Sequence, residues 1–443
     1  MSPNSDQKQK VKVNLIDAVL LGVGGMIGGG VFLLNGFLVY KNKQFSPFSW
    51  LVGLLICLTV VFSYILLSLE YPSNQGTIIY PEKLLENKNT HILIGLLIFF
   101  GYISLTAVYS VSLGEYVANY FNRPFLSNYI AICTIVFCQI INYFSEHTFL
   151  KMEDVTVSLK ILLFLGLITV GVYLPASSSN LLKRGGGGIR KISQTVTNTN
   201  TFSNSIQSVI ILGFAAFLSY EGFEMISDVS DKIENPKQNL PYAYILSVCI
   251  AFVIYFGITY VTNKHIGSHI TRSNQFSSFI NLTKSYGFLK YGPIVIIFLC
   301  ALSNITAINS TIFTNNQIFE NFVTKLKINK HIIQPLNIDI PLPFFREKRK
   351  LAIWIASIIA AALTFLPIII TTNLGSLSFL LIFSIISYLG FKLVVKKENE
   401  HIPIEILNRH IPYSVSKMIT GTSSGLCILG AVMIVWESYT LIR

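Results

Sequence analysis

Residues 22–32 read Gly22-Val23-Gly24-Gly25-Met26-Ile27-Gly28-Gly29-Gly30-Val31-Phe32, inside an apolar run from about Leu15 to Tyr40. The run is longer than the ~20 residues that a helix needs to cross a bilayer. Six of the nine residues from Gly22 to Gly30 are glycine, and glycine weakens a helix by about 1 kcal/mol per residue relative to alanine. Because bare backbone inside a membrane must be buried in protein or line a cavity, two interpretations stand. The stretch is a broken helix that holds a ligand, or a small-residue face that packs on another helix.

The composition of the chain is that of a polytopic membrane protein. Its 443 residues are 52% hydrophobic and 12% charged, with a mean hydropathy of +0.59, whereas soluble proteins have about 25% charged residues. The net charge of +12 is explained by membrane topology, so no nucleic acid is expected as a partner. The six cysteines lie within apolar runs without metal-ligand spacing, so we expect no metal site, disulfide or cofactor.

Apolar spans recur along the whole chain. We predict an all-α integral membrane protein with about 11 transmembrane helices, within the spans 15–40, 48–70, 92–119, 128–143, 156–174, 205–228, 242–263, 290–319, 351–371, 375–395 and 415–439. The first span has no cleavage site of small residues after it, so we interpret it as a membrane helix and not as a removed signal peptide.

Lys and Arg residues predict the orientation, because they gather on the cytoplasmic side of membrane proteins. With the N-terminus inside, the larger share of the 33 basic residues falls in inside segments, and the densest group runs from Lys325 to Lys350. The outside loop is an exception, since it holds Lys183, Arg184, Arg190 and Lys191. We therefore expect a multi-pass protein of the cell membrane with a cytoplasmic N-terminus.

The sixth span carries a second interruption, Phe217-Leu218-Ser219-Tyr220-Glu221-Gly222-Phe223-Glu224. A charge near the bilayer centre costs at least ~2.5 kcal/mol, so such carboxylates face a cavity or a partner. Interruptions in the first and sixth spans lie five spans apart, as in a five-plus-five inverted repeat. In transporters of that kind the broken helices point their N-termini at anionic substrate groups, and freed carbonyls receive cations.

Three segments of the chain resemble the amino acid–polyamine–organocation (APC) permeases. Residues 25–32 are similar to the first-helix pattern GxIGxGIF, and 217–224 with 234–241 are similar to the sixth-helix signature FAFxGFE…KNPxRxIP. Residues 64–76 resemble the end of the second helix, SYAELxxxYPxSGG, although the second glycine is Thr77 here. The resemblance covers about residues 15–395. The family usually has twelve helices, so the last segment lies outside its pattern.

The resemblance implies a LeuT-type 5+5 inverted-repeat bundle with helices 1 and 6 broken. The expected division of the chain is a cytoplasmic N-terminal tail (1–14), the first inverted repeat with helices 1–5 (15–174), an extracellular Gly/Ser/Thr/Asn-rich loop (175–204), the second inverted repeat with helices 6–10 (205–396) and a peripheral C-terminal helix (397–443).

The resemblance also implies a substrate held by backbone groups. The family's carboxylate-binding position falls on Gly28, Gly29 and Gly30, and its amino-group position falls on the carbonyls of Met26, Leu218, Ser219 and Glu221. Free amides at a half-helix N-terminus favour a carboxylate, and carbonyls at a broken end favour an ammonium. A zwitterion fits both.

Lys160 lies within the fifth span. Some members of the family carry a lysine at this position, where sodium-coupled relatives hold an ion. The resemblance therefore implies Lys160 as a coupling residue that loads and releases a proton. The alternative is a lysine near a helix end whose ammonium reaches the membrane interface.

Two glutamates of the sixth span have different expected roles. Glu221 is at a variable position of the signature, where it would select cationic side chains or accept a proton. Alternatively it pairs with Lys160 or with the unwound backbone. Glu224 matches the signature glutamate, which we expect to fix the break and not to contact substrate.

Polar side chains of the third, eighth and tenth spans are further candidates. The eighth span holds a run of hydroxyls and amides that would line a coupling-ion site, although hydrogen bonding between helices is the commoner use of such groups. For the tyrosines, packing or an interfacial belt is the alternative. The candidate pocket or gate residues are Tyr102, Tyr109, Asn309 and Tyr388.

These features predict a secondary active transporter of amino acids that works by alternating access, proton-coupled or sodium-independent. The expected partners are a small-molecule amino acid, protons and the lipid bilayer. The same fold also allows an inorganic cation or polyamine permease and a non-transporting nutrient sensor. An enzyme is not expected, because the seven histidines fall in connections or at span ends, and the chain has no HExxH, no GxSxG and no intramembrane Asp pair.

Overall fold

The computed structural model describes residues 12–74, 76–85, 90–144, 146–175, 199–271, 274–287, 291–325 and 348–442. Its α-helices are α1 (Leu15–Met26), α2 (Gly29–Asn42), α3 (Ser46–Glu70), α4 (Ile79–Leu84), α5 (Thr90–Tyr120), α6 (Ser127–Phe144), α7 (Glu146–Tyr173), α8 (Thr199–Leu218), α9 (Pro236–Ile266), α10 (Ser278–Ser285), α11 (Gly292–Lys325), α13 (Lys348–Leu363), α14 (Ile368–Asn399) and α15 (Tyr413–Ile442).

Short elements connect the helices. The 3₁₀ turns are η1 (Lys43–Phe45), η2 (Gly76–Ile78), η3 (Pro124–Leu126), η4 (Phe223–Val229), η5 (Gly267–His269) and η6 (Gln275–Ser277). Strands β1 (Glu405–Ile406) and β2 (Arg409–His410) form an antiparallel hairpin between α14 and α15. Apart from this hairpin, the described residues confirm the predicted all-α class.

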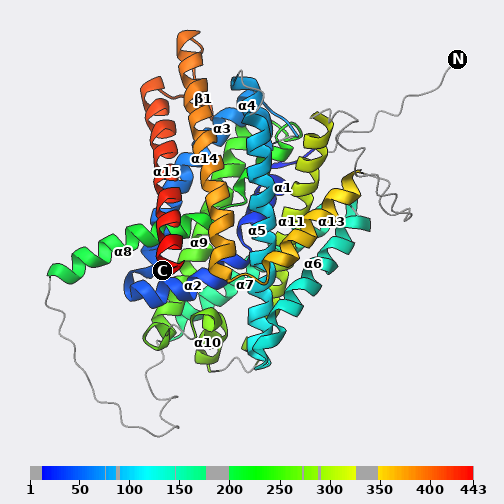
Figure 1. The fold of residues 1–443 in the computed structure, drawn as a ribbon. Helices are drawn as coiled ribbons and strands as arrows, with labels where there is room; N and C mark the ends of the chain where they lie inside the picture. Colours follow the sequence, from blue (N-terminus) through cyan, green and yellow to red (C-terminus); the bar gives the residue numbers. More distant parts are fainter. Residues whose placement is uncertain are drawn as a thin grey trace, which may run out of the picture.

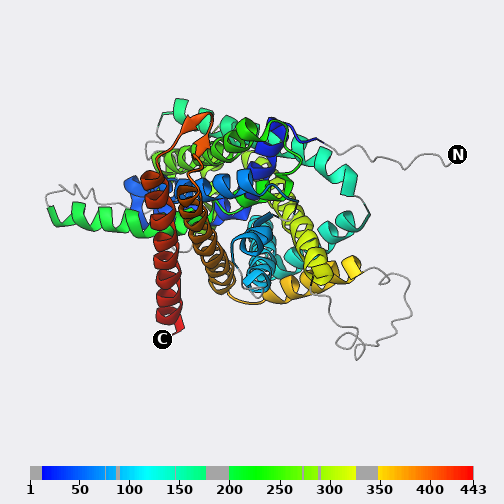
Figure 2. The same ribbon diagram turned by 90° about the horizontal axis from the view of Figure 1, so that it is seen from above.

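The helices form one bundle, with α1 near its centre (Figure 1). Helix α1 packs against α7, α9, α11 and η4, whereas α14 and α15 lie side by side at the edge in both views (Figures 1 and 2). Helix α14 packs on both α3 and α5, which join this edge to the centre. The central position of α1 surrounds its glycines with protein.

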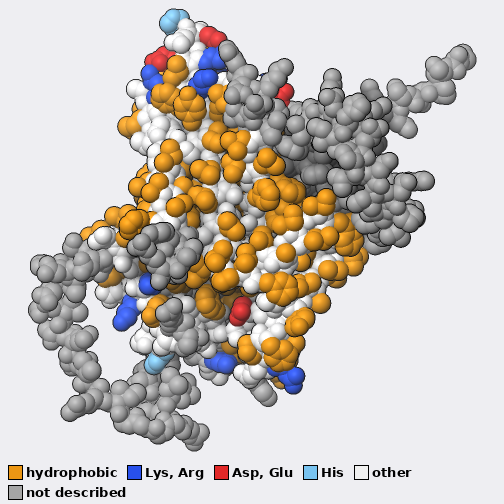
Figure 3. All heavy atoms as spheres, in the orientation of Figure 1, with side chains coloured by type: hydrophobic (Ala, Val, Ile, Leu, Met, Phe, Trp, Pro, Cys, Tyr) orange, Lys and Arg blue, Asp and Glu red, His pale blue; other side chains and the backbone are white. Residues whose placement is uncertain are grey.

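The surface of the bundle suits lipid. Hydrophobic side chains cover the middle of the face in Figure 3, and charged side chains gather toward its two ends. Large apolar residues are exposed on several helices, for example Leu162 at 66%, Phe298 at 53% and Val432 at 58%. Among the described residues, nine helical segments are long and apolar enough to cross a membrane. The chain is therefore a multi-pass membrane protein.

The expectation of about 11 spans stays a prediction. Helix α1 and the apolar part of α13, Trp354–Leu363, are shorter than a full crossing. The stretch Gly29–Glu70 is one of the nine segments, although it contains both α2 and α3. Helix α8 begins at Thr199, so residues 199–204 are helical and not part of the predicted loop 175–204. Most of that loop, with its basic cluster, lies outside the described residues, as does much of the cluster 325–350.

Helix α1 starts at a capping box. The side chain of Asn14 accepts from Asp17 N (3.0 Å), and the Asp17 carboxylate accepts from Asn14 N (3.4 Å). Just before it, Val13 pairs with the segment after η4, because Val13 N donates to Lys232 O and Glu234 N donates to Val13 O, both at 3.0 Å. These bonds connect the residue before α1 to the segment that follows the sixth predicted span.

The glycine stretch combines close packing with an interruption of the helix. A Cβ at Gly22 would lie 2.7 Å from Ser247 Oγ, and one at Gly25 would lie 2.9 Å from Met225 Sδ. These two glycines therefore permit close packing against α9 and η4. Helix α1 then ends at Met26, and α2 begins at Gly29, so the backbone between them leaves the helical path at Ile27 and Gly28.

The sixth predicted span is interrupted in a similar way. Helix α8 ends at Leu218, residues 219–222 form turns, and η4 begins at Phe223. Gly222 has φ +122°, a conformation that side chains rarely adopt. A Cβ there would also overlap the backbone of Gly25 and Met26. Glycine at 222 therefore lets the two interrupted segments touch.

Candidate functional site

The two interruptions, called here the first break (Ile27–Gly28) and the second break (Ser219–Gly222), come together in the bundle. Besides the contact of Gly222 with Gly25, a Cβ at Gly30 would lie 3.1 Å from Ser219 Oγ. The predicted substrate-binding residues, about 190 positions apart in the sequence, lie at or next to these breaks: Met26, Gly28, Gly29 and Gly30 at the first, and Leu218, Ser219 and Glu221 at the second.

Lys160 of α7 spans the space between the first break and α11. Its ammonium donates to Gly24 O (3.0 Å), to Ile27 O (2.9 Å) and to Thr306 Oγ1 (3.1 Å). The side chain is 0% exposed, so it does not reach the membrane interface. A positive charge at the carbonyl end of α1 is favourable, because these carbonyls carry the negative end of the helix dipole.

Tyr255 of α9 links the two breaks through one hydroxyl. Its oxygen lies 2.7 Å from Met26 O and 2.8 Å from Ser219 O. A hydroxyl has one hydrogen, so it donates to one carbonyl at a time. Sequence reasoning missed Tyr255, because nothing in the local pattern of α9 separates it from a packing tyrosine.

Three of the four carbonyls predicted for a substrate amino group, those of Met26, Leu218 and Ser219, have internal partners in this structure. Besides Tyr255, Met26 O accepts from Gly28 N (2.9 Å), and Leu218 O accepts from Glu221 N (3.2 Å). A carbonyl has two lone pairs, so Leu218 O keeps accepting capacity, whereas both lone pairs of Met26 O are used whenever Tyr255 donates to it. The role of these carbonyls in substrate binding stays a prediction.

Glu224 holds the second break. Its Oε2 accepts from Gly222 N (2.8 Å), and its Oε1 accepts from Tyr102 Oη (2.8 Å). The carboxylate thereby joins the turn at 222 to α5. Both contacts agree with the expectation that Glu224 fixes the break, and they place Tyr102 beside it as part of the same network.

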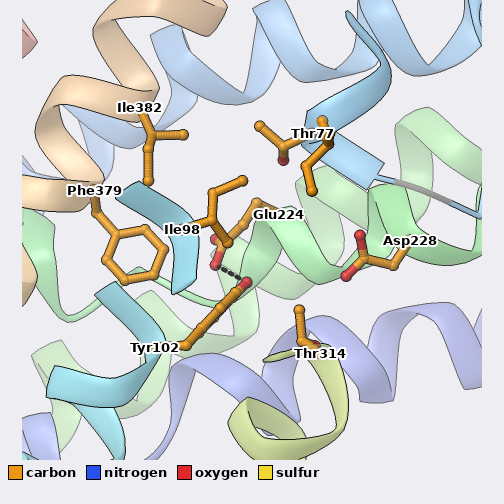
Figure 4. A pocket seen from close by; sticks show the side chains of 9 residues that line it. Thr77, Ile98, Tyr102, Glu224, Asp228, Thr314, Phe379 and Ile382 are labelled. Atoms are coloured by element: carbon orange, nitrogen blue, oxygen red, sulfur yellow. Dashed lines mark hydrogen bonds between the residues drawn. The ribbon is translucent and has the colours of Figure 1, made fainter. Parts of the chain in front are cut away.

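A small cavity adjoins this network (Figure 4). Its volume leaves room for about one water molecule, so it is not an amino acid site. Asp228 points toward the same space as Glu224 and Tyr102 in Figure 4. The lining residues are Thr77, Ile78, Ile98, Tyr102, Glu224, Asp228, Thr314, Phe379 and Ile382.

The remaining predicted residues lie in different surroundings. Tyr109 packs on the first break, since a Cβ at Gly28 would lie 3.0 Å from its ring. Glu221 is 2% exposed, and its Oε1 has no hydrogen-bond partner among the described residues. Asn309 Oδ1 accepts from Asn142 Nδ2 (3.0 Å), which makes it a contact between α11 and α6.

Tyr388 is not where a pocket wall would be. It lies on α14 with 50% of its surface exposed. The residues of α14 that reach the cavity are Phe379 and Ile382, and six residues of helix from Ile382 bring Tyr388 to a different face. The alternative interpretation of this tyrosine, an exposed or interfacial ring, fits its position.

Known proteins match most of this chain. A family model described as amino acid permease matches residues 13–441. The inner membrane transport protein YbaT of Escherichia coli is 22% identical over 324 residues, which cover 72% of this chain and 70% of that protein.

Two further relatives match a smaller share. The aspartate-proton symporter of Bacillus subtilis is 27% identical over 259 residues, 55% of this chain and 46% of that protein. An uncharacterized protein of Methanocaldococcus jannaschii is 26% identical over 250 residues, 56% of this chain and 54% of that protein. The chain thus aligns with about half the length of these two relatives.

Proposed function

Because the chain belongs to the amino acid permease family of the APC superfamily, we propose that it carries amino acids across the cell membrane by alternating access. Membership makes it a membrane transporter and not an enzyme, and it implies the LeuT fold. The observation that carries the substrate proposal is the meeting of the two breaks beside three consecutive glycines at the start of α2.

The chemistry of the breaks supports a zwitterionic substrate. Helix α2 begins at Gly29, so the amides of its first turn lack intrahelical partners and favour a carboxylate. The end of α1 and the turn after α8 present carbonyls, which favour an ammonium. We assign the carboxylate to residues 28–30 and the amino group to the acceptors that face them.

We propose the inverted-repeat organisation as the frame for this site. Helices α1–α7 would form the first repeat, helices α8–α14 the second, and α15 a peripheral helix, with a cytoplasmic N-terminus. Helix α15 packs mainly on α14 and α3, which supports its peripheral assignment.

We propose that transport is sodium-independent and that Lys160 is the proton-coupling residue. Its ammonium supplies a positive charge to the carbonyls of the first break and joins them to α11. Loss of the proton would weaken these charge-assisted hydrogen bonds, loosen α1 from α7 and α11, and let one part of the bundle rock against the other.

A permease for cationic substrates, polyamines included, is a second candidate, and Glu221 is the observation that favours it. Its carboxylate is buried with an unpaired oxygen, which suits a positively charged side chain. If Glu221 faces the substrate, Glu221→Gln weakens lysine and arginine more than leucine and alanine, because a broken buried charge pair costs several kcal/mol. An equal loss for all four assigns Glu221 to structure or coupling.

The test of the proposed function combines binding and transport. Amino acids that bind the folded protein raise its melting temperature, so a thermal-shift screen of amino acids, polyamines and inorganic cations identifies the class. Uptake into proteoliposomes, with proton and sodium gradients imposed separately, then distinguishes a transporter from a sensor. A strict sodium requirement, or a shift with cations alone, contradicts the proposal.

A further inference from the structure

Asn304 of α11 presents an unpaired oxygen beside the first break. Its Nδ2 donates to Cys300 O (2.8 Å) and lies 3.2 Å from Cys300 Sγ. Because a backbone carbonyl only accepts, the atom facing it must be the amide nitrogen, and this fixes the direction of Oδ1. Asn304 is 0% exposed, and Oδ1 has no hydrogen-bond partner among the residues that the structure describes.

This oxygen is aimed at the start of α2. A Cβ at Gly29 would lie 2.6 Å from Asn304 Oδ1, so any side chain at 29 would cover it. The hydroxyl of the preceding residue, Ser303, is also buried without a described partner. Leaving a buried acceptor unpaired is costly, and native structures keep few such groups without a reason.

Two backbone acceptors at the breaks are better satisfied, whereas Glu221 Oε1 is, like Asn304 Oδ1, without a partner among the described residues. Met26 O and Ser219 O both lie within hydrogen-bond distance of the Tyr255 hydroxyl, whereas Asn304 Oδ1 lies next to the same glycines with its lone pairs unused. If the carboxylate of an amino acid binds at residues 28–30, its ammonium group would lie close to Asn304 Oδ1.

We propose that Asn304 Oδ1 accepts a hydrogen bond from the ammonium group of the transported amino acid and thereby selects amino acids over carboxylic acids that lack the amine. The inference rests on the proposed function. Because Gly29 packs directly on Oδ1 in this structure, the bound amine separates the first turn of α2 from α11. Asn304 therefore couples recognition of the amine to a movement at the first break.

The test compares ligands that differ in the amine alone. Purified protein is titrated with alanine against propionate and with aspartate against succinate. The wild type prefers the amino acid of each pair, and in Asn304→Leu this preference falls by about 10- to 100-fold, the value of a hydrogen bond to a charged group. An unchanged preference in Asn304→Leu overturns the inference.

A second variant distinguishes the role of the oxygen from that of the amide nitrogen. Asn304→Asp keeps an acceptor of the same size and adds negative charge, so the preference for the amine is kept or increased. If Asn304 instead donated to the substrate carboxylate through its amide nitrogen, Asn304→Asp would weaken the binding of propionate and of alanine equally. That outcome would contradict the inference, and it can be measured even if Asn304→Leu does not fold.

Asn142 of α6 is a matched control. Its Nδ2 also donates to the carbonyl of a cysteine four residues earlier, Cys138 O (2.9 Å), but its second bond goes to Asn309 Oδ1 (3.0 Å), and neither bond involves a glycine. Asn142→Leu therefore lowers the melting temperature and leaves the amine preference unchanged. If the wild type binds no amino acid, the proposed function is wrong. If the wild type binds amino acids and Asn304→Leu keeps the same preference for the amine, only the inference about Asn304 is wrong.

Discussion

The two breaks are held by opposite charges that come from different places in the chain. At the first break the ammonium of Lys160 holds the carbonyls of Gly24 and Ile27. At the second break the carboxylate of Glu224 holds the amide of Gly222. Each charge matches the exposed end of the helix that it contacts, a cation at freed carbonyls and an anion at a freed amide.

The two charged residues differ in how far they lie along the sequence from the break that they contact. Lys160 reaches the first break from another helix, α7, and also binds Thr306 of α11, whereas Glu224 is two residues from the amide that it holds. The proposed loss of a proton from Lys160 would therefore loosen the contact of the first break with α7 and α11, whereas the bond between Glu224 and Gly222 does not depend on the position of another helix. We infer that the first break is the part of the site that moves.

The largest expected effect is at the first break itself. A leucine in Gly29→Leu would place its Cβ 2.6 Å from Asn304 Oδ1 and 2.9 Å from Ser112 Cβ. The first turn of α2 would shift, and uptake would fall by about 100-fold, the loss that a misplacement of 1 Å can cause. Proteoliposome uptake measures it.

Gly166 of α7 is the control for this substitution, because a Cβ there meets nothing within 4 Å. Gly166→Leu leaves uptake near the wild-type value. Normal uptake by folded Gly29→Leu would remove residues 28–30 from the substrate site.

The next largest effect tests the charge that holds the first break. In Lys160→Ala the carbonyls of Gly24 and Ile27 lose a charged donor, so proton-stimulated uptake falls about 10-fold or more. Lys237→Ala changes an exposed lysine and leaves uptake unaltered. Proton stimulation that survives in Lys160→Ala would assign the lysine to structure alone.

The sequence predicted the positions of both breaks because glycine is costly in a helix and therefore marks where one is interrupted. Gly28 and Gly222 both lie at the predicted interruptions. Lys160 was singled out by the family resemblance, since a lysine in an apolar span by itself fits an interfacial position equally well.

Contacts across the bundle were beyond sequence reasoning. Tyr255 and Asn304 lie in helices with several other tyrosines and asparagines, and only the packing shows which of them face the breaks. Tyr388 was selected from its span by residue type, and the structure places it on an exposed face. A helix without a strong polar face does not reveal from sequence which of its sides is buried.

A smaller effect tests the group that joins the breaks. Tyr255→Phe removes the hydroxyl shared by Met26 O and Ser219 O but keeps the ring, whose centroid lies 4.6 Å from that of Trp50. One hydrogen bond of about 1 kcal/mol is lost, so KM rises about 5-fold. Tyr260→Phe, on the exposed face of α9, is the control. A larger loss than in Lys160→Ala would show that the bridge, and not the lysine, dominates the first break.

The smallest effect is expected at the second break. In Glu224→Gln the amide oxygen still accepts from Gly222 N, and the amide nitrogen donates to Tyr102 Oη in place of the bond that the carboxylate accepted. Both hydrogen bonds are kept and only the charge is lost, so KM changes about 2-fold, a free-energy change of about 0.4 kcal/mol. Glu224→Leu, which cannot hold the amide, should lose far more. If Glu224→Gln abolished uptake as Lys160→Ala does, the charge of Glu224 would itself take part in coupling, and the second break would not be the passive partner of the first.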